Sequence, residues 1–405
     1  MKTGYKETDV GIIPAHWDCI PIANVARLES GHTPSRREPS YWGGSFQWVS
    51  LHDTDALDGA EIYNTAQTIT QEGLNNSSAR LLPKGTVVFS RTATVGKACV
   101  LGREMATSQD FANYVCGPQL HNHFLVYLFR SMEKVWQSYM AGSIHNTIYM
   151  PVFKALKIAC PPLHEQQAIA TALSDVDALL GSLDRLIAKK RDLKQAAMQQ
   201  LLTGKTRLPG FGKTSKFNET ELGALPEDWS LRRIRDIAIV GRGRVISHRE
   251  INGSHNPSYP VYSSQTYNDG IMGYLDSFDF DGEYITWTTD GVNAGTVFHR
   301  HGRFNCTNVC GTIMLKDDNA AFVSRVLGRI TPRHVSWNLG NPKLMNDAMK
   351  RITLALPRRE EQDAIAEVLS DMDAELAALE QRRDKTCLLK QGMMQELLTG
   401  RKRLI

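Results

Sequence analysis

The sequence predicts a mixed α+β chain in which two globular segments alternate with two long helices. One long stretch occurs twice, from His164 to Leu208 and from Glu360 to Leu404, with about half of its positions identical. A shorter motif also occurs twice, once ahead of each globular segment. Because both repeats keep the same order, we predict an internal duplication with approximate two-fold symmetry.

Each copy of the long stretch has the hydrophobic spacing of a coiled-coil helix. Apolar residues alternate steps of four and three along a narrow seam, at Ile169, Leu173, Val176, Leu180, Leu183 and Ile187, and at Ile365, Leu369, Met372, Leu376 and Leu379. Each helix follows a proline and is predicted to stop at a Thr-Gly pair. About 40 residues form a rod of about 60 Å. A seam this narrow needs a partner helix, so we predict that the two copies pair.

The outer faces of these helices carry charged residues. We expect the outer faces to meet partner proteins or solvent, at Asp175, Asp177, Arg185 and Lys189.

The globular segments share an opening motif and then diverge. YKETDVGIIPAHW begins at Tyr5 and FNETELGALPEDW at Phe217, so that glycine, proline and tryptophan coincide at Gly11/Gly223, Pro14/Pro226 and Trp17/Trp229. Both segments contain short strand-like runs followed by polar loops, SRTATVGK and TTDGVNAG. The predicted division is a first globular domain over 1–163, a helix over 164–204, a linker over 205–216, a second globular domain over 217–359 and a helix over 360–405.

Composition places few limits on function. The 405 residues suffice for two or three domains, and 42% of them are hydrophobic. A net charge of +4 permits a nucleic-acid partner without requiring one. No apolar run approaches the roughly 18 residues of a membrane span, and no secretory signal opens the chain. Seven scattered cysteines suggest free thiols, so we expect a cytoplasmic location and no membrane partner.

The chain resembles the specificity subunits of type I restriction–modification systems over essentially its whole length. The resemblance rests on the two long helices with their LLTG ends, the paired G-x-x-P-x-x-W motifs, the run GHTPSRREPSYWGGSFQWVSLHD from Gly31, and the pair PPLHEQQ and PRREEQ. Each motif alone is weak, but two copies in register are specific.

The resemblance implies a DNA-reading role without catalysis. Each globular domain would be a target-recognition domain that reads one half of a split double-stranded DNA site. The helices would form an antiparallel coiled coil that also docks two methyltransferase subunits, and through them restriction subunits in the full complex. S-adenosylmethionine, ATP and Mg²⁺ are then expected on the partner subunits, and this chain needs no cofactor.

The residues agree with the absence of a catalytic site. Methylation of an adenine amino group requires an Asn/Asp-Pro-Pro-aromatic turn around the flipped base, and the nearest string, starting at Asn256, lacks the second proline. Neither Gly204-Lys205-Thr206 nor Gly212-Lys213-Thr214 has the first glycine of a phosphate-binding loop. His299, His301, Cys306 and Cys310 have no common zinc spacing, so we predict no metal site.

DNA contacts should come from polar loops and basic side chains of the two recognition domains. Arg and Lys read guanine edges, Asn and Gln read adenine, and phosphates accept any donor. In the first domain the candidates are His32, Thr33, Ser35, Arg36, Arg37, Arg91, Thr92, Thr94 and Lys97, with Gln109 and Asn113 behind them. In the second domain they are Arg242, Arg244, His248, Arg249, Ser263, Ser264, Gln265, Thr288, Thr289, Asn293, His299 and Arg300.

Two alternatives remain open from the residues alone. A coiled-coil adaptor that bridges two protein partners without binding DNA would explain the repeat equally well. An enzyme is the third interpretation, disfavoured because no catalytic constellation is present. Divergent loops on a shared frame favour two DNA targets read by one scaffold.

Overall fold

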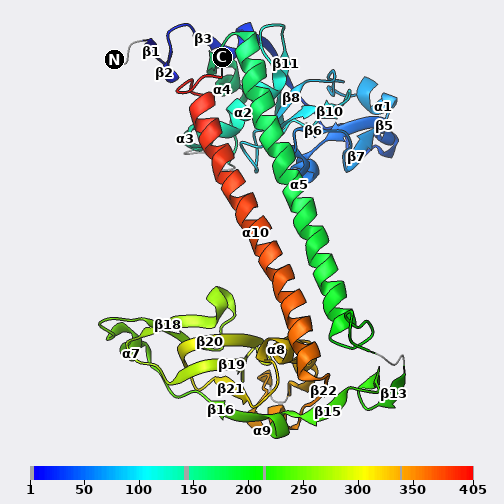
Figure 1. Ribbon diagram of the computed structural model, residues 1–405. Coiled ribbons are helices and arrows are strands. Elements are labelled where there is room, and N and C mark those ends of the chain that lie inside the picture. The colour runs from blue at the N-terminus through cyan, green and yellow to red at the C-terminus, as the bar shows by residue number, and fades with distance from the viewer. Residues whose placement is uncertain (1–3, 141–145, 213–215, 338–339, 405) are drawn as a thin grey trace. The chain divides into compact units, whose positions relative to one another are not determined.

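The computed structural model describes residues 4–140, 146–212, 216–337 and 340–404, which form two compact units. Unit 1 comprises Met1–Arg185 with Glu380–Ile405, and unit 2 comprises Leu186–Leu379. Each unit therefore contains one globular segment and parts of both long helices (Figure 1). The predicted mixed fold with two domains and two long helices is confirmed.

The two long helices are α5 (Leu163–Leu201) and α10 (Arg359–Leu397). α5 follows two prolines, and the Pro162 carbonyl accepts hydrogen bonds from the backbone of its first turn. Beyond the last turn, Gly204 and Gly400 both have φ +68°, a left-handed conformation that favours glycine and closes the helix. The predicted Thr-Gly stop is thus confirmed in both copies.

Ion pairs fix an antiparallel register between the helices. In unit 1, Lys390 Nζ lies 2.6 Å from the Asp177 carboxylate. In unit 2, Lys194 pairs with Asp373, the repeat equivalents of that pair. As residue numbers rise along α5, those of the partners fall along α10. Lys194 and Lys390 therefore each pair with a carboxylate of the opposite helix. The expectation that Asp177 lies on an outer face is wrong, because it bonds both Lys390 and the Tyr127 hydroxyl.

The seam residues are buried or half-buried throughout. Leu183 is 4% exposed and Ile187 is 3% exposed near the middle of α5. Toward the helix ends the seam merges with the domain cores. Leu173 packs in the core of unit 1, and Leu369 packs in the core of unit 2. The helices are thus held by domain packing as well as by each other.

Unit 1 is built on a five-stranded sheet with the order β4-β11-β8-β9-β6. A three-stranded sheet, β10-β5-β7, lies in the same unit, with the hairpin β1-β2 and the antiparallel pair β12-β3. Its elements are β1 (Tyr5–Thr8), β2 (Gly11–Pro14), β3 (Asp18–Pro21), β4 (Ala26–Ser30), β5 (Trp42–Val49), β6 (Glu61–Ile62), β7 (Gln67–Ile69), α1 (Gln71–Asn75), β8 (Val87–Ser90), β9 (Ala98–Leu101), β10 (Ala106–Thr107), β11 (Phe111–Cys116), α2 (Asn122–Ser131), α3 (Glu133–Met140), α4 (Met150–Ala155) and β12 (Lys157–Cys160).

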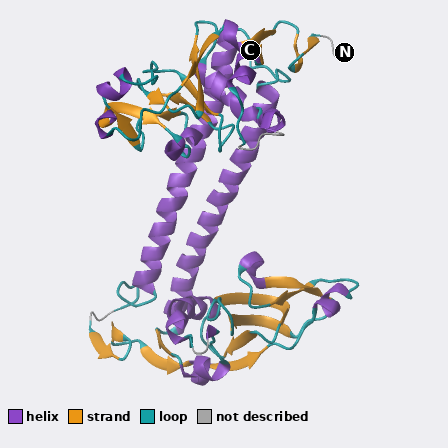
Figure 2. Ribbon diagram, turned by 180° about the vertical axis from the view of Figure 1, so that it is seen from behind, coloured by secondary structure: helices purple, strands orange, loops and turns teal. Residues whose placement is uncertain are grey.

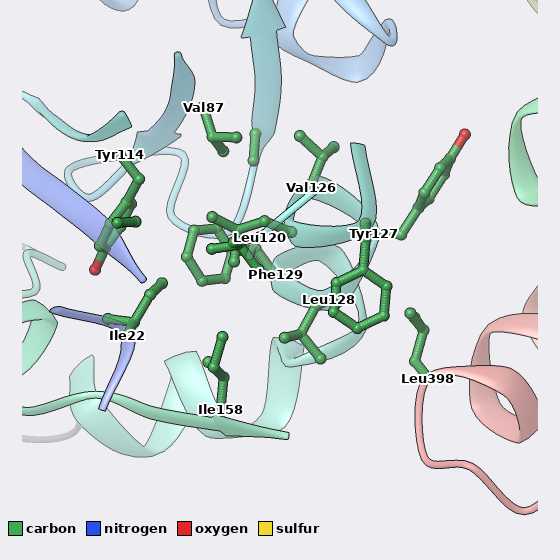
Figure 3. Close-up of a cluster of buried hydrophobic side chains, with 14 of the residues drawn as sticks. Ile22, Val87, Tyr114, Leu120, Val126, Tyr127, Leu128, Phe129, Ile158 and Leu398 are labelled. Carbon is green, nitrogen blue, oxygen red and sulfur yellow. The ribbon is translucent and has the colours of Figure 1, made fainter. Parts of the chain in front are cut away.

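The core of unit 1 joins the sheet, the helices beside it and the end of the chain. Val87 of β8, Tyr114 of β11 and Phe129 of α2 are buried in one cluster. Leu398, just beyond α10, belongs to this cluster, and Figure 3 shows it pointing toward the helix that carries Leu128. Leu397 and Leu398, at and just after the end of α10, therefore contribute to the core of the first globular segment.

Unit 2 has a six-stranded sheet with the order β16-β21-β19-β20-β17-β18, and two strand pairs, β13-β14 and β15-β22. Figure 2 shows its strands with the short helices around them. The elements are β13 (Phe217–Thr220), β14 (Gly223–Pro226), β15 (Ser230–Arg233), α6 (Ile234–Ile237), β16 (Ala238–Arg242), α7 (His248–Asn252), β17 (Tyr259–Tyr262), β18 (Ile271–Leu275), β19 (Phe280–Thr288), β20 (Val297–Cys306), β21 (Cys310–Leu315), α8 (Ala320–Ile330), α9 (Asn346–Arg351) and β22 (Thr353–Leu356).

A close approach of two strands requires glycine in this sheet. A methyl group at Gly311 of β21 would lie 2.2 Å from the buried indole of Trp287 on β19. The Trp287 Nε1 donates to the Leu344 carbonyl at 2.8 Å, which anchors the segment before α9. None of the helices in the described ranges is long and apolar enough to cross a membrane.

Candidate nucleic-acid interface

In unit 1, the polar loops predicted to contact DNA meet at one end of the five-stranded sheet. β4 and β8 are both antiparallel to β11, so the ends of β4 and β8 lie beside the start of β11. Hydrogen bonds join the loops that follow: His32 N donates to the Thr107 carbonyl at 2.9 Å, and Arg91 N donates to Asp110 at 3.0 Å. Three loops far apart in sequence, 31–41, 90–97 and 107–110, thus form one surface.

Loop 31–41 is shaped by two tryptophans around one arginine. The Arg36 guanidinium lies 4.1 Å from the ring centre of Trp42 and donates to the Gln67 side chain at 2.9 Å. Trp48 Nε1 donates to the His32 carbonyl. Arg36 therefore has a structural role in holding the loop, and the neighbouring exposed Arg37 is available for a phosphate or base.

Loop 90–97 is tight and internally bonded. The Ser90 hydroxyl lies 3.0 Å from that of Thr94, and Ala93 has φ +61°. The Arg91 side chain donates to two backbone carbonyls, and burial lowers the pKa of its guanidinium. Lys97 pairs with Asp55 and Asp58, and its hydrogen bond with Asp58 raises the pKa of Lys97. The hydroxyl-bearing residues Thr92 and Thr94 flank Ala93, the residue with the left-handed backbone.

Unit 2 places an equivalent loop at the same strand end. Ser90 N bonds the Lys97 carbonyl in unit 1, and Thr288 N bonds the Thr296 carbonyl in unit 2, at 2.9 and 3.0 Å. The two loops share this closure but differ in side chains. Thr288 and Thr289 are buried, whereas Asn293 reaches toward the neighbouring loop, its Nδ2 lying 3.3 Å from the Ser264 carbonyl.

The arginines of this surface in unit 2 are largely neutralised by carboxylates. Arg242 bonds the Thr289 hydroxyl at 2.9 Å and lies 3.5 Å from Asp290. Arg244 pairs with Glu250 and Asp279, and the hydrogen bond with Glu250 raises the pKa of Arg244. Free positive charge at this end of unit 2 is therefore smaller than the number of arginines suggests.

The remaining predicted residues of unit 2 lie either on α7 and the loop after β17 or on strand β20. His248 and Arg249 are exposed on α7, and Ser263, Ser264 and Gln265 follow β17. His299 lies on the face of β20 with its ring nitrogen 2.7 Å from the Glu283 carboxylate. Arg300 is 4% exposed and belongs to the interior. The assignment of DNA contacts to individual residues of these groups stays a prediction.

In each unit, the opening motif packs closely against the residues that end a long helix. We call this contact the joint. A methyl group at Gly400 would lie 2.4 Å from Pro14, and one at Gly204 would lie 2.5 Å from Pro226. The helix end after α10 thus packs on the motif of unit 1, and the end after α5 packs on that of unit 2. Each of these two positions requires glycine, because the proline ring that it meets is rigid and a larger side chain would clash with it.

A buried glutamate at the start of a long helix completes each joint. In unit 1, Glu165 accepts hydrogen bonds from Arg403 at 3.0 Å and from Trp17 at 3.1 Å. Burial raises the pKa of Glu165, but hydrogen bonds from Arg403, Trp17 and His16 outweigh it, so the net pKa is lowered. In unit 2, Arg207 binds Glu361 through two nitrogens, at 2.5 and 2.6 Å.

Within the part of the chain that the structure describes, no group of three or more His, Cys, Asp or Glu side chains is placed to hold a metal ion. Of the four residues weighed as zinc ligands, Cys306 and Cys310 are buried, and His299 is engaged by a carboxylate. Alternation along β20 directs His299 and His301 to the same exposed face, on either side of the buried Arg300.

Comparison with known proteins identifies the family. The family model for the type I restriction modification DNA specificity domain matches residues 14–189 and 226–386, which is most of the chain. The chain belongs to the type I specificity subunit family. Both matches cover one recognition domain and much of the helix that follows it, in agreement with the duplication seen in the sequence.

Relatives and solved structures agree with this assignment. The MjaIX specificity subunit of Methanocaldococcus jannaschii is 28% identical over 253 residues, 62% of this chain and 58% of that protein. The MpnII specificity subunit of Mycoplasma pneumoniae is 40% identical over 139 residues, 34% of this chain and 42% of that protein. The match thus spans less than two thirds of either relative.

The fold of a type I specificity subunit extends over the whole chain. The crystal structure of the type I S subunit from M. genitalium has a TM-score of 0.60 at 15% identity and covers 98% of this chain and 99% of its own. The HsdS subunit from Thermoanaerobacter tengcongensis has a TM-score of 0.52 at 16% identity, covering 96% and 98%.

Two sets of residues in this specificity subunit escaped sequence reasoning. The first is the anchor of each joint, Glu165 with Arg403 and Glu361 with Arg207; both pairs stand in the repeated motifs, so their recurrence was a usable signal. The second is a set of exposed apolar residues on the loops of unit 2, which a search for polar and basic side chains passes over.

Proposed function

We propose that this chain is the DNA-reading subunit of a type I restriction–modification complex, in which each recognition domain binds one half of a bipartite, asymmetric DNA site. The observation that carries the proposal is the pair of equivalent loop surfaces with different side chains. A shared closure at Ser90 and at Thr288 supports two surfaces of one kind. Different residues on them support two different half-sites.

The chain supplies recognition, and its partners supply chemistry. We propose that two methyltransferase subunits dock on it and that restriction subunits join through them. S-adenosylmethionine, ATP and Mg²⁺ belong on those partners in this scheme. The side chains at the loop surfaces suit binding: hydroxyls, amides and guanidinium groups donate to phosphates and base edges, and the arginines cannot act as bases at neutral pH.

The proposal predicts that the purified chain alone transfers no methyl groups to DNA. Adding its methyltransferase partner with labelled S-adenosylmethionine should start transfer, and sequencing the methylated genome of expressing cells should give two short blocks separated by unread base pairs. The blocks should differ, with one methylated adenine in each, on opposite strands. Transfer by the chain alone, or a single continuous motif, would contradict the proposal. Assembly with partners but no sequence-specific DNA binding would favour the adaptor.

A further inference from the structure

The loop end of unit 2 carries an unusual set of exposed apolar side chains. Among the described residues, the four most exposed large hydrophobic side chains are Val292 at 89%, Val245 at 73%, Tyr267 at 72% and Trp337 at 70%. Val245, Tyr267 and Val292 stand on three different loops, 243–247, 263–270 and 289–296, and Trp337 stands on the described segment 335–337. Exposed apolar groups gathered at one place mark an interaction surface.

Hydrogen bonds join these four segments to one another. Arg244 N donates to the Cys306 carbonyl and Thr307 N donates to Tyr262, which connects the first two loops through the end of β20. The Asn293 amide reaches Ser264 at 3.3 Å and connects the second loop to the third. Gly291 N donates to Pro342, and Lys343 exchanges backbone hydrogen bonds with Ser336, next to Trp337, which connects the third loop to the segment 335–337. These hydrogen bonds hold the four segments beside one another.

The tip that carries Tyr267 is a tight turn closed by hydrogen bonds. Asn268, Asp269 and Gly270 all have positive φ, at 48°, 52° and 80°. Asn and Asp adopt the left-handed region more readily than other non-glycine residues, so the run Asn268-Asp269-Gly270 suits a tight turn. Here Ser263 N donates to the Gly270 carbonyl at 3.0 Å and closes the loop.

The buried Arg300 holds this turn through Asp269. Its guanidinium donates to the Asp269 carboxylate at 2.5 Å and to the Asp269 carbonyl at 2.7 Å. It lies 3.7 Å from the ring centre of Tyr262 and 4.3 Å from that of Phe298. An arginine fixed between two rings has its planar donors already aligned, so it can pin the next loop.

We propose that Tyr267 is a base-contacting residue of the second recognition domain, which stacks on the bases of its half-site, and that Arg300 is its positioning residue. The proposal rests on the DNA-reading function above. Because neighbouring pairs cover the base faces in a duplex, the ring inserts at a base step that opens on binding. A planar ring stacks on any base exposed there, and a ring held on a rigid loop loses little conformational entropy on binding. Ser264, Asn293 and the exposed Arg249 lie on the same set of loops and nearby α7, and such groups suit DNA better than an apolar protein face.

The test uses the full complex of the chain with its methyltransferase partner and duplexes that carry the recognised site. 2-Aminopurine is placed at successive positions of the block read by the second domain, so that its fluorescence reports stacking. Tyr267→Ala should weaken binding of the site roughly 5- to 150-fold and abolish the fluorescence change. Tyr267→Phe should retain both. The control is Tyr274→Ala, which removes another exposed tyrosine from β18 and should change neither.

The role of Arg300 is tested by combining substitutions. Arg300→Met should weaken site binding in the otherwise unchanged chain but add nothing to Tyr267→Ala, because it acts through the tyrosine. Asp269→Asn, a milder change at an exposed side chain, should show the same dependence if Arg300→Met impairs folding. Additive losses would overturn the positioning role.

The outcomes separate this inference from the proposed function. If the unchanged complex shows no preference for any bipartite site, the proposed function fails. If it prefers its site and Tyr267→Ala binds as tightly as Tyr274→Ala, only the role of Tyr267 fails. A Tyr267→Ala chain that keeps its DNA affinity but no longer assembles with the methyltransferase would also overturn the inference and assign the surface to a protein.

Discussion

Glu165 and Glu361 occupy equivalent places in the two units but are held by different partners. Glu165 binds Arg403 and the Trp17 indole. Glu361 is bound by Arg207, whose hydrogen bonds with Asp228 and Glu361 raise the pKa of Arg207. The Trp229 indole nitrogen, equivalent to that of Trp17, is buried without a hydrogen-bond partner among the described residues. The two motifs therefore form different hydrogen-bond networks: Arg207 binds both Glu361 and Asp228, whereas Glu165 accepts from both Arg403 and the Trp17 indole.

At the residue scale, we predict that Glu165 makes the stability of unit 1 depend on acidity. Its net pKa in the folded chain lies below the ordinary value of 4.5. The unfolded chain therefore binds the proton more readily, and the stabilisation is present above about pH 4.5 and is lost as pH falls through the lower, folded pKa. Thermal unfolding followed from neutral to acidic pH should show a smaller acid-dependent loss for Glu165→Gln than for the unchanged chain.

The control for this prediction is Glu7→Gln, at an exposed position of β1. It should leave the pH profile unchanged. Above about pH 5, Glu165→Gln should be less stable by roughly 1–3 kcal/mol, since the Arg403 guanidinium loses a buried charged acceptor. Identical profiles for all three chains would show that Glu165 titrates as it does in the unfolded state.

At the scale of the elements, the long helices are stabilised by a buried seam and by charges that cross it. Leu173 is fully buried in the core of unit 1, whereas Leu179, less than two turns along α5, is 39% exposed. Cross-helix ion pairs lie along the margin of the seam, partly exposed, so each contributes little on its own. Burial of the apolar seam therefore stabilises the helices more than the ion pairs do.

We predict that Leu173→Ala lowers the free energy of unfolding by roughly 2–5 kcal/mol, because it leaves a cavity where helix and domain meet. Leu179→Ala is the matched control at an exposed position of the same helix, and it should cost less than about 1 kcal/mol. Chemical denaturation of the two variants would measure the difference. Equal stabilities would mean that the seam does not hold the helix in place.

At the scale of the whole molecule, we propose that helix length sets the spacing between the two half-sites. The same register pairs Asp177 with Lys390 in unit 1 and Lys194 with Asp373 in unit 2. A heptad inserted into both helices, after Leu183 and after Arg383, would lengthen the rods while both pairs are kept. A heptad in α5 alone would prevent both pairs from forming together.

The expected result is a longer unread spacer for the double insertion, with unchanged bases in each block, and loss of site binding for the insertion in α5 alone. Sequencing of methylated genomic DNA would identify the spacer, and a binding assay on duplexes of varied spacing would confirm it. A spacer that stays the same length after the double insertion would refute control by helix length.

The sequence alone was enough to establish the duplication, the two long helices, their glycine stops and the family. These features depend on local signals: hydrophobic spacing, a proline before each helix, and a left-handed glycine after it. Each signal is also present twice, so one copy supports the other.

Tertiary structure decided which side chains remain available. Arg36, Arg91, Arg244 and Arg300 are all basic residues in loops or strand ends by sequence, yet carboxylates, carbonyls and aromatic rings engage them in the fold. Conversely, Tyr267 is exposed although its side chain is one that usually packs in a core. Charge and polarity are properties of a residue, whereas an ion pair or an exposed ring depends on partners brought from distant parts of the chain. The sequence therefore predicts where the loops are, and the packing around them determines what each loop can touch.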